Sequence, residues 1–255
     1  VTGTENLILA SVLKKGTVTL KNCAKEPHVV DLCRMLISMG AQIDGVGTDQ
    51  LKIAGVNKLH STHFKISSDY MEIGTYMVAA AITGGRIKLS FDTTLDIDPI
   101  AEILKRFGVS FNFQSDGCLV EVNRLMAPDK VTTNIWPGFP TDLMSAVIVM
   151  ATQADGVTLC HDWIYESRMF FTDKLISMGA KITIADPHRV LVYGPSKLRA
   201  RELESPDIRA GMALVLAALI SEGESIINRA ELIERGYEDV VGKLSKLGAN
   251  IKKRP

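Results

Sequence analysis

The sequence predicts an α/β (α+β) protein made of a repeated unit of helix, strand, helix, strand and strand. Three observations predict this fold class. Helix-ending glycines recur about every seventy residues. The residues after each glycine alternate between apolar and polar, as in a half-buried strand. One helix of each unit is apolar on nearly every side, as in "SAVIVMA" (145–151), so it must be buried all round. We therefore expect buried helices inside a shell of sheets.

The first series of repeats joins the end of a helix to a strand. Its members are "LISMGAQID", "LKRFGVSFNF", "LISMGAKITI" and "LSKLGANIK", with glycines Gly40, Gly108, Gly179 and Gly248. Glycine is favoured just after a helix because it adopts the left-handed backbone conformation at low cost. The even spacing of these glycines indicates four copies of one unit.

A second series with the same spacing supplies the other helix of each unit. Its helical runs end at Gly16, Gly85, Gly156 and Gly223. The segments "DQLKIAGV", "GCLVEVN" and "RVLVYGP" read as closing strands of the first three units. The fourth unit has no such segment, and an unpaired sheet edge is a liability. We expect another segment to fill that edge, and because the sequence begins at Val1 without methionine, we expect a missing N-terminal part to do so.

Composition narrows the class of protein. Lys plus Arg and Asp plus Glu are both 29, so the formal net charge is zero, which argues against nucleic acid or a membrane surface as the main partner. Runs such as "MALVLAALI" are too short to span a bilayer, and no leader peptide is visible. Four cysteines without regular spacing favour reduced, buried thiols and a cytoplasmic location. His60 and His63 form an H-x-x-H without further ligands, so we expect no metal site.

Charged residues fall at matched places in the third and fourth units. Asp142 and Arg209 lie equally far before the first glycine of their units, at the start of the first helix. Arg168 and Arg235 lie equally far after it, near the start of the second helix. An arginine at a helix N-terminus opposes the helix dipole unless an anion compensates. Free helix N–H groups together with arginine side chains are suited to a phosphate or carboxylate.

Simpler interpretations of the same residues remain open at this point. Asp142 would complement the helix dipole even as a plain first-turn acid. Each arginine also has an acidic neighbour in the sequence, so a surface ion pair is equally compatible with the pattern: Arg168 with Glu166, Arg209 with Asp207 and Arg235 with Glu234.

Several motifs together resemble the enolpyruvyl transferase family, and in particular its members that act on UDP-N-acetylglucosamine. They are "VTGTENLILA" (1–10), "AKEPHVVDLC" (24–33), "FPTD" (139–142), "DIRAGMALVLA" (207–217) and "ERGYEDVVGKLSKLGANI" (234–251). The resemblance implies an inside-out α/β barrel of six units in two three-unit domains. Residues 1–66 would be the last unit of the first domain. Residues 67–255 would be the second domain without its closing strand, which the family's extreme N-terminus supplies.

The resemblance also implies a reaction and its residues. The family transfers enolpyruvyl from phosphoenolpyruvate to the 3-hydroxyl of UDP-N-acetylglucosamine and releases phosphate, the committed step of peptidoglycan synthesis, without a cofactor. By resemblance Asp142 would be the general base, and Arg209 and Arg235 would hold the carboxylate and phosphate of phosphoenolpyruvate. The same comparison assigns substrate-binding roles to Val1, Thr2, Ile164 and Arg168, besides Asp142 itself.

Departures from the family leave two other hypotheses. The family's loop cysteine and early Lys-Asn pair belong to a part that this sequence lacks, and Tyr70 stands where the family usually has arginine. Without that part the chain would be a non-catalytic nucleotide-sugar-binding module. An RNA 3'-terminal phosphate cyclase also stacks similar units, but the neutral charge and the absence of a matching histidine context disfavour it.

Overall fold

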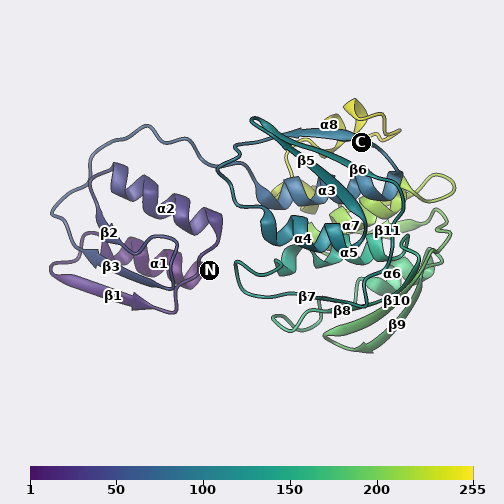
Figure 1. The fold of residues 1–255 in the computed structure, drawn as a ribbon, viewed down its shortest axis with the longest axis horizontal. Coiled ribbons are helices and arrows are strands. Elements are labelled where there is room, and N and C mark those ends of the chain that lie inside the picture. Colours follow the sequence, from purple (N-terminus) through teal and green to yellow (C-terminus); the bar gives the residue numbers. More distant parts are fainter. Residues whose placement is uncertain (255) are drawn as a thin grey trace.

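The computed structural model describes residues 1–254, which form a smaller N-terminal part and a larger second part (Figure 1). In the first part, helices α1 and α2 pack against a three-stranded antiparallel sheet of order β1-β3-β2. Its elements are α1 (Thr2–Ser11), β1 (Thr17–Lys21), α2 (Pro27–Ser38), β2 (Gln42–Asp44) and β3 (Gln50–Ala54). This is the predicted order of one repeat unit.

The second part repeats that order with additions. Its first unit comprises α3 (Tyr70–Thr83), β4 (Ile87–Ser90), α4 (Asp98–Arg106), β5 (Val109–Gln114) and β6 (Gly117–Val122). The next comprises β7 (Lys130–Thr132), the 3-10 helix η1 (Thr141–Leu143), α5 (Met144–Ala151), β8 (Gly156–His161), α6 (Thr172–Ser177), β9 (Lys181–Asp186) and β10 (Arg189–Gly194). The last comprises β11 (Glu202–Glu204), α7 (Ile208–Leu219), β12 (Ile226–Asn228), the 3-10 helix η2 (Ala230–Arg235) and α8 (Val240–Lys246).

Each unit of the second part contributes a sheet. The strand orders are β4-β6-β5, β7-β8-β10-β9 and β11-β12. Strands β7 and β11 are parallel additions beside β8 and β12. The sequence pattern did not predict them, because three residues are too few to show an alternation. In the four-stranded sheet, buried Cys160 is opposite Val190 on one side and Val131 on the other.

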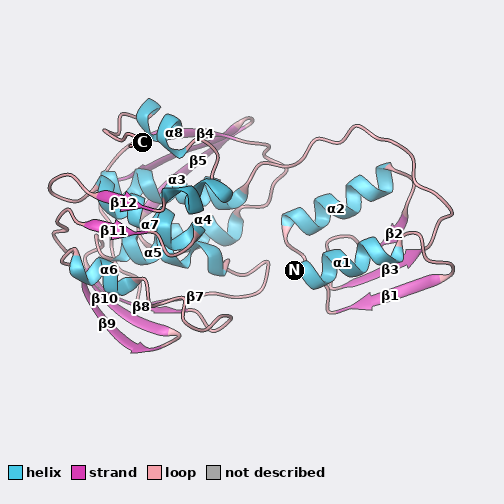
Figure 2. Cartoon of the chain, turned by 180° about the vertical axis from the view of Figure 1, so that it is seen from behind, coloured by secondary structure: helices cyan, strands magenta, loops and turns pink. Residues whose placement is uncertain are grey.

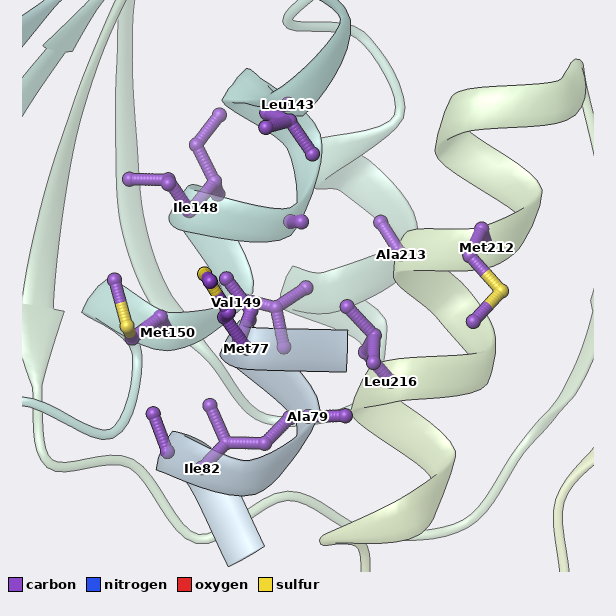
Figure 3. Packing of buried hydrophobic residues seen from close by; sticks show 14 of the residues in the cluster. Met77, Ala79, Ile82, Leu143, Ile148, Val149, Met150, Met212, Ala213 and Leu216 are labelled. Atoms are coloured by element: carbon purple, nitrogen blue, oxygen red, sulfur yellow. The ribbon is translucent and has the colours of Figure 1, made fainter. Parts of the chain in front are cut away.

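Three apolar helices, α3, α5 and α7, form the centre of the second part. All eight residues of α5 are buried, and side chains such as Met77, Val149 and Leu216 from the three helices meet in one cluster (Figure 3). The sheets lie outside these helices (Figures 1 and 2). A helix without a polar face has to be enclosed in this way. The expectation of buried helices inside sheets is therefore confirmed.

Aromatic and polar contacts join the two parts. The ring of His28 on α2 stacks on Tyr70 with centroids 6.2 Å apart, and Tyr70 packs against Trp136 at 5.1 Å. Asp31 accepts hydrogen bonds from the backbone N–H and the hydroxyl of Ser67, at 2.8 and 2.9 Å. Tyr70, at the position where the resemblance led us to expect arginine, makes a mainly aromatic contact. Burial raises the pKa of its hydroxyl, so the Tyr70 side chain stays uncharged at neutral pH.

The two parts have separate hydrophobic cores. Helix α1 buries Ile8 but leaves Leu7 and Leu9 about half exposed, as is Leu13 just after the helix, whereas its counterpart α5 is wholly buried. At the other end of the chain, β11 and β12 form only a two-stranded sheet, and residues 249–254 form no strand. No helix among residues 1–254 is long and apolar enough to cross a membrane.

We predict that amide hydrogens in residues 1–66 exchange faster than those of α3, α5 and α7. The smaller core protects fewer backbone groups, and the outer face of α1 is open to water. Hydrogen exchange followed by mass spectrometry on the 255-residue chain would measure this difference. Equal protection along the chain would contradict the division into two domains at residue 66.

Candidate functional site

Two helix starts bring the central charged residues of the site together. Asp142 lies in η1, directly before α5, and Arg209 lies in the first turn of α7. Because α5 and α7 pack side by side in the core, these ends adjoin. Nη1 of Arg209 and Nη1 of Arg168 each donate to Oδ1 of Asp142, and both distances are 2.9 Å. One carboxylate oxygen therefore joins two guanidinium groups.

Asp142 does not cap its helix. No backbone N–H of the described residues donates to its side chain, so Asp142 is a first-turn acid without a capping hydrogen bond. Asp207 does cap α7, since it accepts from the backbone N–H groups of Arg209 and Ala210 at 2.8 and 3.0 Å. Within residues 1–254 nothing donates to Oδ2 of Asp142, and the side chain is 46% exposed. The second oxygen is open to a ligand.

Arg168 lies in the turn before α6 and not on the helix itself, where its spacing had suggested a helix start. Its Nη1 also donates to the hydroxyl of Thr141. The guanidinium carbon lies 4.0 Å from the ring centroid of Tyr165, a cation–π contact. The surface ion pair considered for Arg168 and Glu166 does not form, because the arginine turns inward to Asp142.

The two arginines differ in their electrostatics. Burial, and then the charge of Arg209, lower the pKa of Arg168, against the opposing effect of Asp142. Burial also acts to lower the pKa of Arg209, but the hydrogen bond and charge of Asp142 outweigh it and raise this pKa. Both side chains stay charged at neutral pH. The site therefore holds two cations that share Asp142, with Asp207 as a second carboxylate on Arg209 at 3.5 Å. Guanidinium groups placed in this way are suited to binding a further anion.

A cavity of about 270 Å³ lies beside the arginine pair. Arg168, Arg209 and Lys174 contribute its cationic lining, while Phe170 and Phe171 contribute apolar surface. Lys174 makes no ion pair with any residue among 1–254 and was not predicted from the sequence. Cationic groups next to an apolar wall suit a small anionic molecule with an apolar part.

Arg235 is not part of this cluster. It is the last residue of η2, which packs against α7, and its side chain is exposed. Helix α8 begins only at Val240, so Arg235 precedes the second helix of its unit. The surface pair considered for Arg235 with Glu234 does not form, since Glu234 binds Lys253 at 2.7 Å. Among residues 1–254 Arg235 has no ion pair.

The predicted substrate-binding residues fall in two places. Ile164 lies in the same loop as Arg168, and its backbone N–H donates to Oδ1 of Asp162 at 3.1 Å. Val1 and Thr2 begin α1 and do not form a loop. They lie in the first part, with the N terminus towards the second part (Figure 1). No hydrogen bond or ion pair of the described chain joins them to Asp142.

Sequence reasoning missed three polar residues around the cluster: Thr141, Asp162 and Lys174. Thr141 stands inside the quoted "FPTD" motif, which could have drawn attention to it. Asp162 is a single acid after a strand and gives no local signal. Within residues 1–254 no three His, Cys, Asp or Glu side chains are grouped so as to hold a metal ion. The four cysteines are buried and unpaired.

The fold and this cluster define a repeat-built α/β protein with an anion-binding, carboxylate-bearing site at joined helix starts. The family model of EPSP synthase (3-phosphoshikimate 1-carboxyvinyltransferase) matches residues 1–244. The chain belongs to this family, the EPSP synthase or enolpyruvyl transferase family. The resemblance drawn from the motifs is thereby confirmed.

Individual relatives agree with the family model. UDP-N-acetylglucosamine 1-carboxyvinyltransferase of Borrelia garinii subsp. bavariensis is 47% identical over 99% of this chain and 61% of its own length. The protein of that name from Treponema denticola is 46% identical over 98% of this chain and again 61% of its own length. The chain thus spans about three fifths of the curated relatives that it matches.

Solved structures confirm the fold class. The enolpyruvyl transferase NikO from Streptomyces tendae superimposes with a TM-score of 0.87 at 26% identity, covering 98% of this chain and 60% of NikO. EPSP synthase from Acinetobacter baumannii gives 0.71 at 21% identity, covering 96% of this chain and 60% of the synthase. At 21% identity, the second match supports the fold and nothing about function.

We predict that Asp142→Asn strengthens binding of inorganic phosphate to the 255-residue chain. Loss of the carboxylate charge leaves Arg168 and Arg209 without their shared anion, so a phosphate can replace it. The measurement is the rise in melting temperature with phosphate, against sodium chloride at equal ionic strength. Asp186→Asn, which removes a carboxylate paired with Arg189, is the matched control. An equal phosphate response in both variants would contradict the prediction.

Proposed function

We propose that this chain is the base-bearing portion of a UDP-N-acetylglucosamine enolpyruvyl transferase. The reaction transfers enolpyruvyl from phosphoenolpyruvate to the 3-hydroxyl of the sugar and releases phosphate, which starts peptidoglycan synthesis. The observation that supports it most is the state of Asp142. One carboxylate oxygen is held by two arginines, the other accepts no hydrogen bond from the described residues, and the side chain is 46% exposed. The names of the relatives supply the nucleotide sugar and the carboxyvinyl group, and the resemblance to the family supplies phosphoenolpyruvate as its donor.

The proposed chemistry begins with Asp142. Its open Oδ2 accepts the proton of the sugar 3-hydroxyl while the hydroxyl oxygen forms a bond to C2 of phosphoenolpyruvate. A proton is added to C3 in the same addition, from a group that this chain does not supply. The tetrahedral intermediate then returns a proton from C3 to the group that donated it, the double bond between C2 and C3 forms again, and the bond from C2 to the phosphate oxygen breaks. The electron pair leaves with phosphate.

The arginines have a second task in this proposal. Arg168 and Arg209 already hold two positive charges at the start of α5 and α7, and they would bind the carboxylate of phosphoenolpyruvate as it approaches Asp142. Arg235 would move its exposed side chain onto the phosphate. Ile164 would contact the uridine part of the nucleotide sugar, and Val1 and Thr2 would contact the nucleotide from the first part.

The partner implied by this function is the remainder of the transferase. Residues 1–66 would be the last unit of a first domain and residues 67–255 a second domain lacking its closing strand. The half-exposed leucines of α1 and the two-stranded last sheet support this assignment. A missing N-terminal portion would supply the other units, the closing strand and the proton donor, and the whole would work in the cytoplasm.

We predict that Asp142→Asn abolishes phosphate release by the chain supplied with the N-terminal portion of a relative, while the fold stays intact. An amide accepts no proton at neutral pH, so the hydroxyl stays protonated. Phosphate release with both substrates measures turnover, and circular dichroism checks the fold. Asp186→Asn should keep full turnover. Retained activity of Asp142→Asn would refute its role as base, and an inactive wild-type assembly that still binds the nucleotide sugar would favour the non-catalytic binding module.

We predict that Arg235→Ala weakens the use of phosphoenolpyruvate by about 2–5 kcal/mol in kcat/KM. In the proposed substrate complex the phosphate would bury this exposed arginine, and truncating one partner of a buried charge pair typically costs that much. Steady-state kinetics with varied phosphoenolpyruvate would measure this. Arg229→Ala, which removes an exposed arginine paired with Glu204, is the control and should change little. Unchanged constants for Arg235→Ala would rule out its contact with the phosphate.

A further inference from the structure

A fully buried carboxylate lies beneath the site. Asp162 follows the last residue of β8 and has 0% exposure. Its backbone N–H donates to the carbonyl of His188 at 2.9 Å, and its own carbonyl contacts Nδ1 of His188 at 2.7 Å. The backbone of Asp162 is thus held at the end of β8 by the turn between β9 and β10. No cation forms an ion pair with Asp162 within residues 1–254.

The carboxylate of Asp162 is satisfied by hydrogen bonds from three separate segments. Oδ1 accepts from the hydroxyl of Thr133 at 3.0 Å and from the backbone N–H of Ile164 at 3.1 Å, and Oδ2 accepts from the hydroxyl of Thr141. A buried carboxylate without these donors would be strongly unfavourable. Asp162 therefore holds three segments together: the connection after β7 through Thr133, the "FPTD" segment through Thr141, and the loop of Arg168 through Ile164.

The hydrogen-bond directions continue from Asp162 to Asp142. Arginine only donates, so at the contact with Nη1 of Arg168 the hydroxyl oxygen of Thr141 accepts. The single hydrogen of that hydroxyl then points to Asp162. The same Nη1 gives its other hydrogen to Oδ1 of Asp142. The contacts thus run from Asp162 through Thr141 and Arg168 to Asp142, and at each hydrogen bond only one of the two groups can be the donor.

We propose that Asp162 is a positioning residue for the general base: through Thr141 and Arg168 it holds one oxygen of Asp142 and leaves the other open to substrate. This inference rests on the function proposed above. Asp162 itself touches no substrate. Its negative charge also acts to raise the pKa of Arg168, so the guanidinium that holds Asp142 is stabilised in its charged form.

Asp162→Asn tests the proposal, because an amide presents a donor where the carboxylate only accepts. In the chain supplied with the N-terminal portion, kcat should fall roughly 100-fold, the typical effect of a displacement of about 1 Å at a reacting group, while both KM values stay close to wild type. Asp162→Glu, which keeps the charge, should recover part of the loss. Thr158→Val is the matched control, since Thr158 is equally buried on β8 and its hydroxyl has no partner in the described chain.

A double-mutant cycle separates positioning from a merely structural role. Thr141→Val breaks the contact chain but leaves Asp162 in place, so it should lower kcat by itself. If both residues act through one chain of contacts, the double variant should be no slower than the slower single variant. Fully multiplicative losses, or wild-type kcat in both single variants, would overturn the proposal. Should Asp162→Asn fail to fold, wild-type kcat in Thr141→Val would still refute it.

The results also distinguish this inference from the proposed function. Turnover in Asp142→Asn would refute the base itself, whatever Asp162 does. An inactive Asp142→Asn beside a fully active Asp162→Asn would leave the proposed function standing and refute only the positioning role.

Discussion

The packing of α3, α5 and α7 is the constraint on which the rest of the structure depends. Helix α5 has no exposed residue, so its neighbours must enclose it completely, and their directions follow from that requirement. Once the helices are packed, the starts of α5 and α7 adjoin, and the residues at those starts meet. Asp142 and Arg209 are neighbours because the apolar faces of α5 and α7 pack together.

The charged cluster at these helix starts holds the carboxylate of Asp142 in place. Two guanidinium groups share one oxygen of Asp142, which fixes the carboxylate. Because the Asp142 side chain is 46% exposed, its charge is not stranded in a dry interior, where an ion pair often costs more than it contributes. Fixed donors around an open acceptor are the arrangement that acid–base chemistry on an anionic substrate requires.

Much of the fold could be predicted because the same glycine ends a helix in each repeat and so marks where each unit lies in the sequence. The helix-ending Gly40, Gly108, Gly179 and Gly248 have φ between 88° and 106°, a region that other residues rarely adopt. Strands β7 and β11 escaped prediction because each has only three residues and pairs with a strand far along the chain. Arg168 lies close to the second helix of its unit, as its register predicted, but in the turn before it, since α6 begins only at Thr172.

The sequence by itself determined the repeat, the buried faces of the helices and the matched register of Asp142, Arg168, Arg209 and Arg235. Only the tertiary structure decided their partners. Arg168 binds Asp142, 26 residues away, and not nearby Glu166. Arg209 binds Asp142 across 67 residues as well as nearby Asp207. Arg235 binds neither Asp142 nor its sequence neighbour Glu234. The physical reason is that sequence spacing predicts contacts only within about one helical turn, whereas the meeting of two helix ends depends on how whole helices pack.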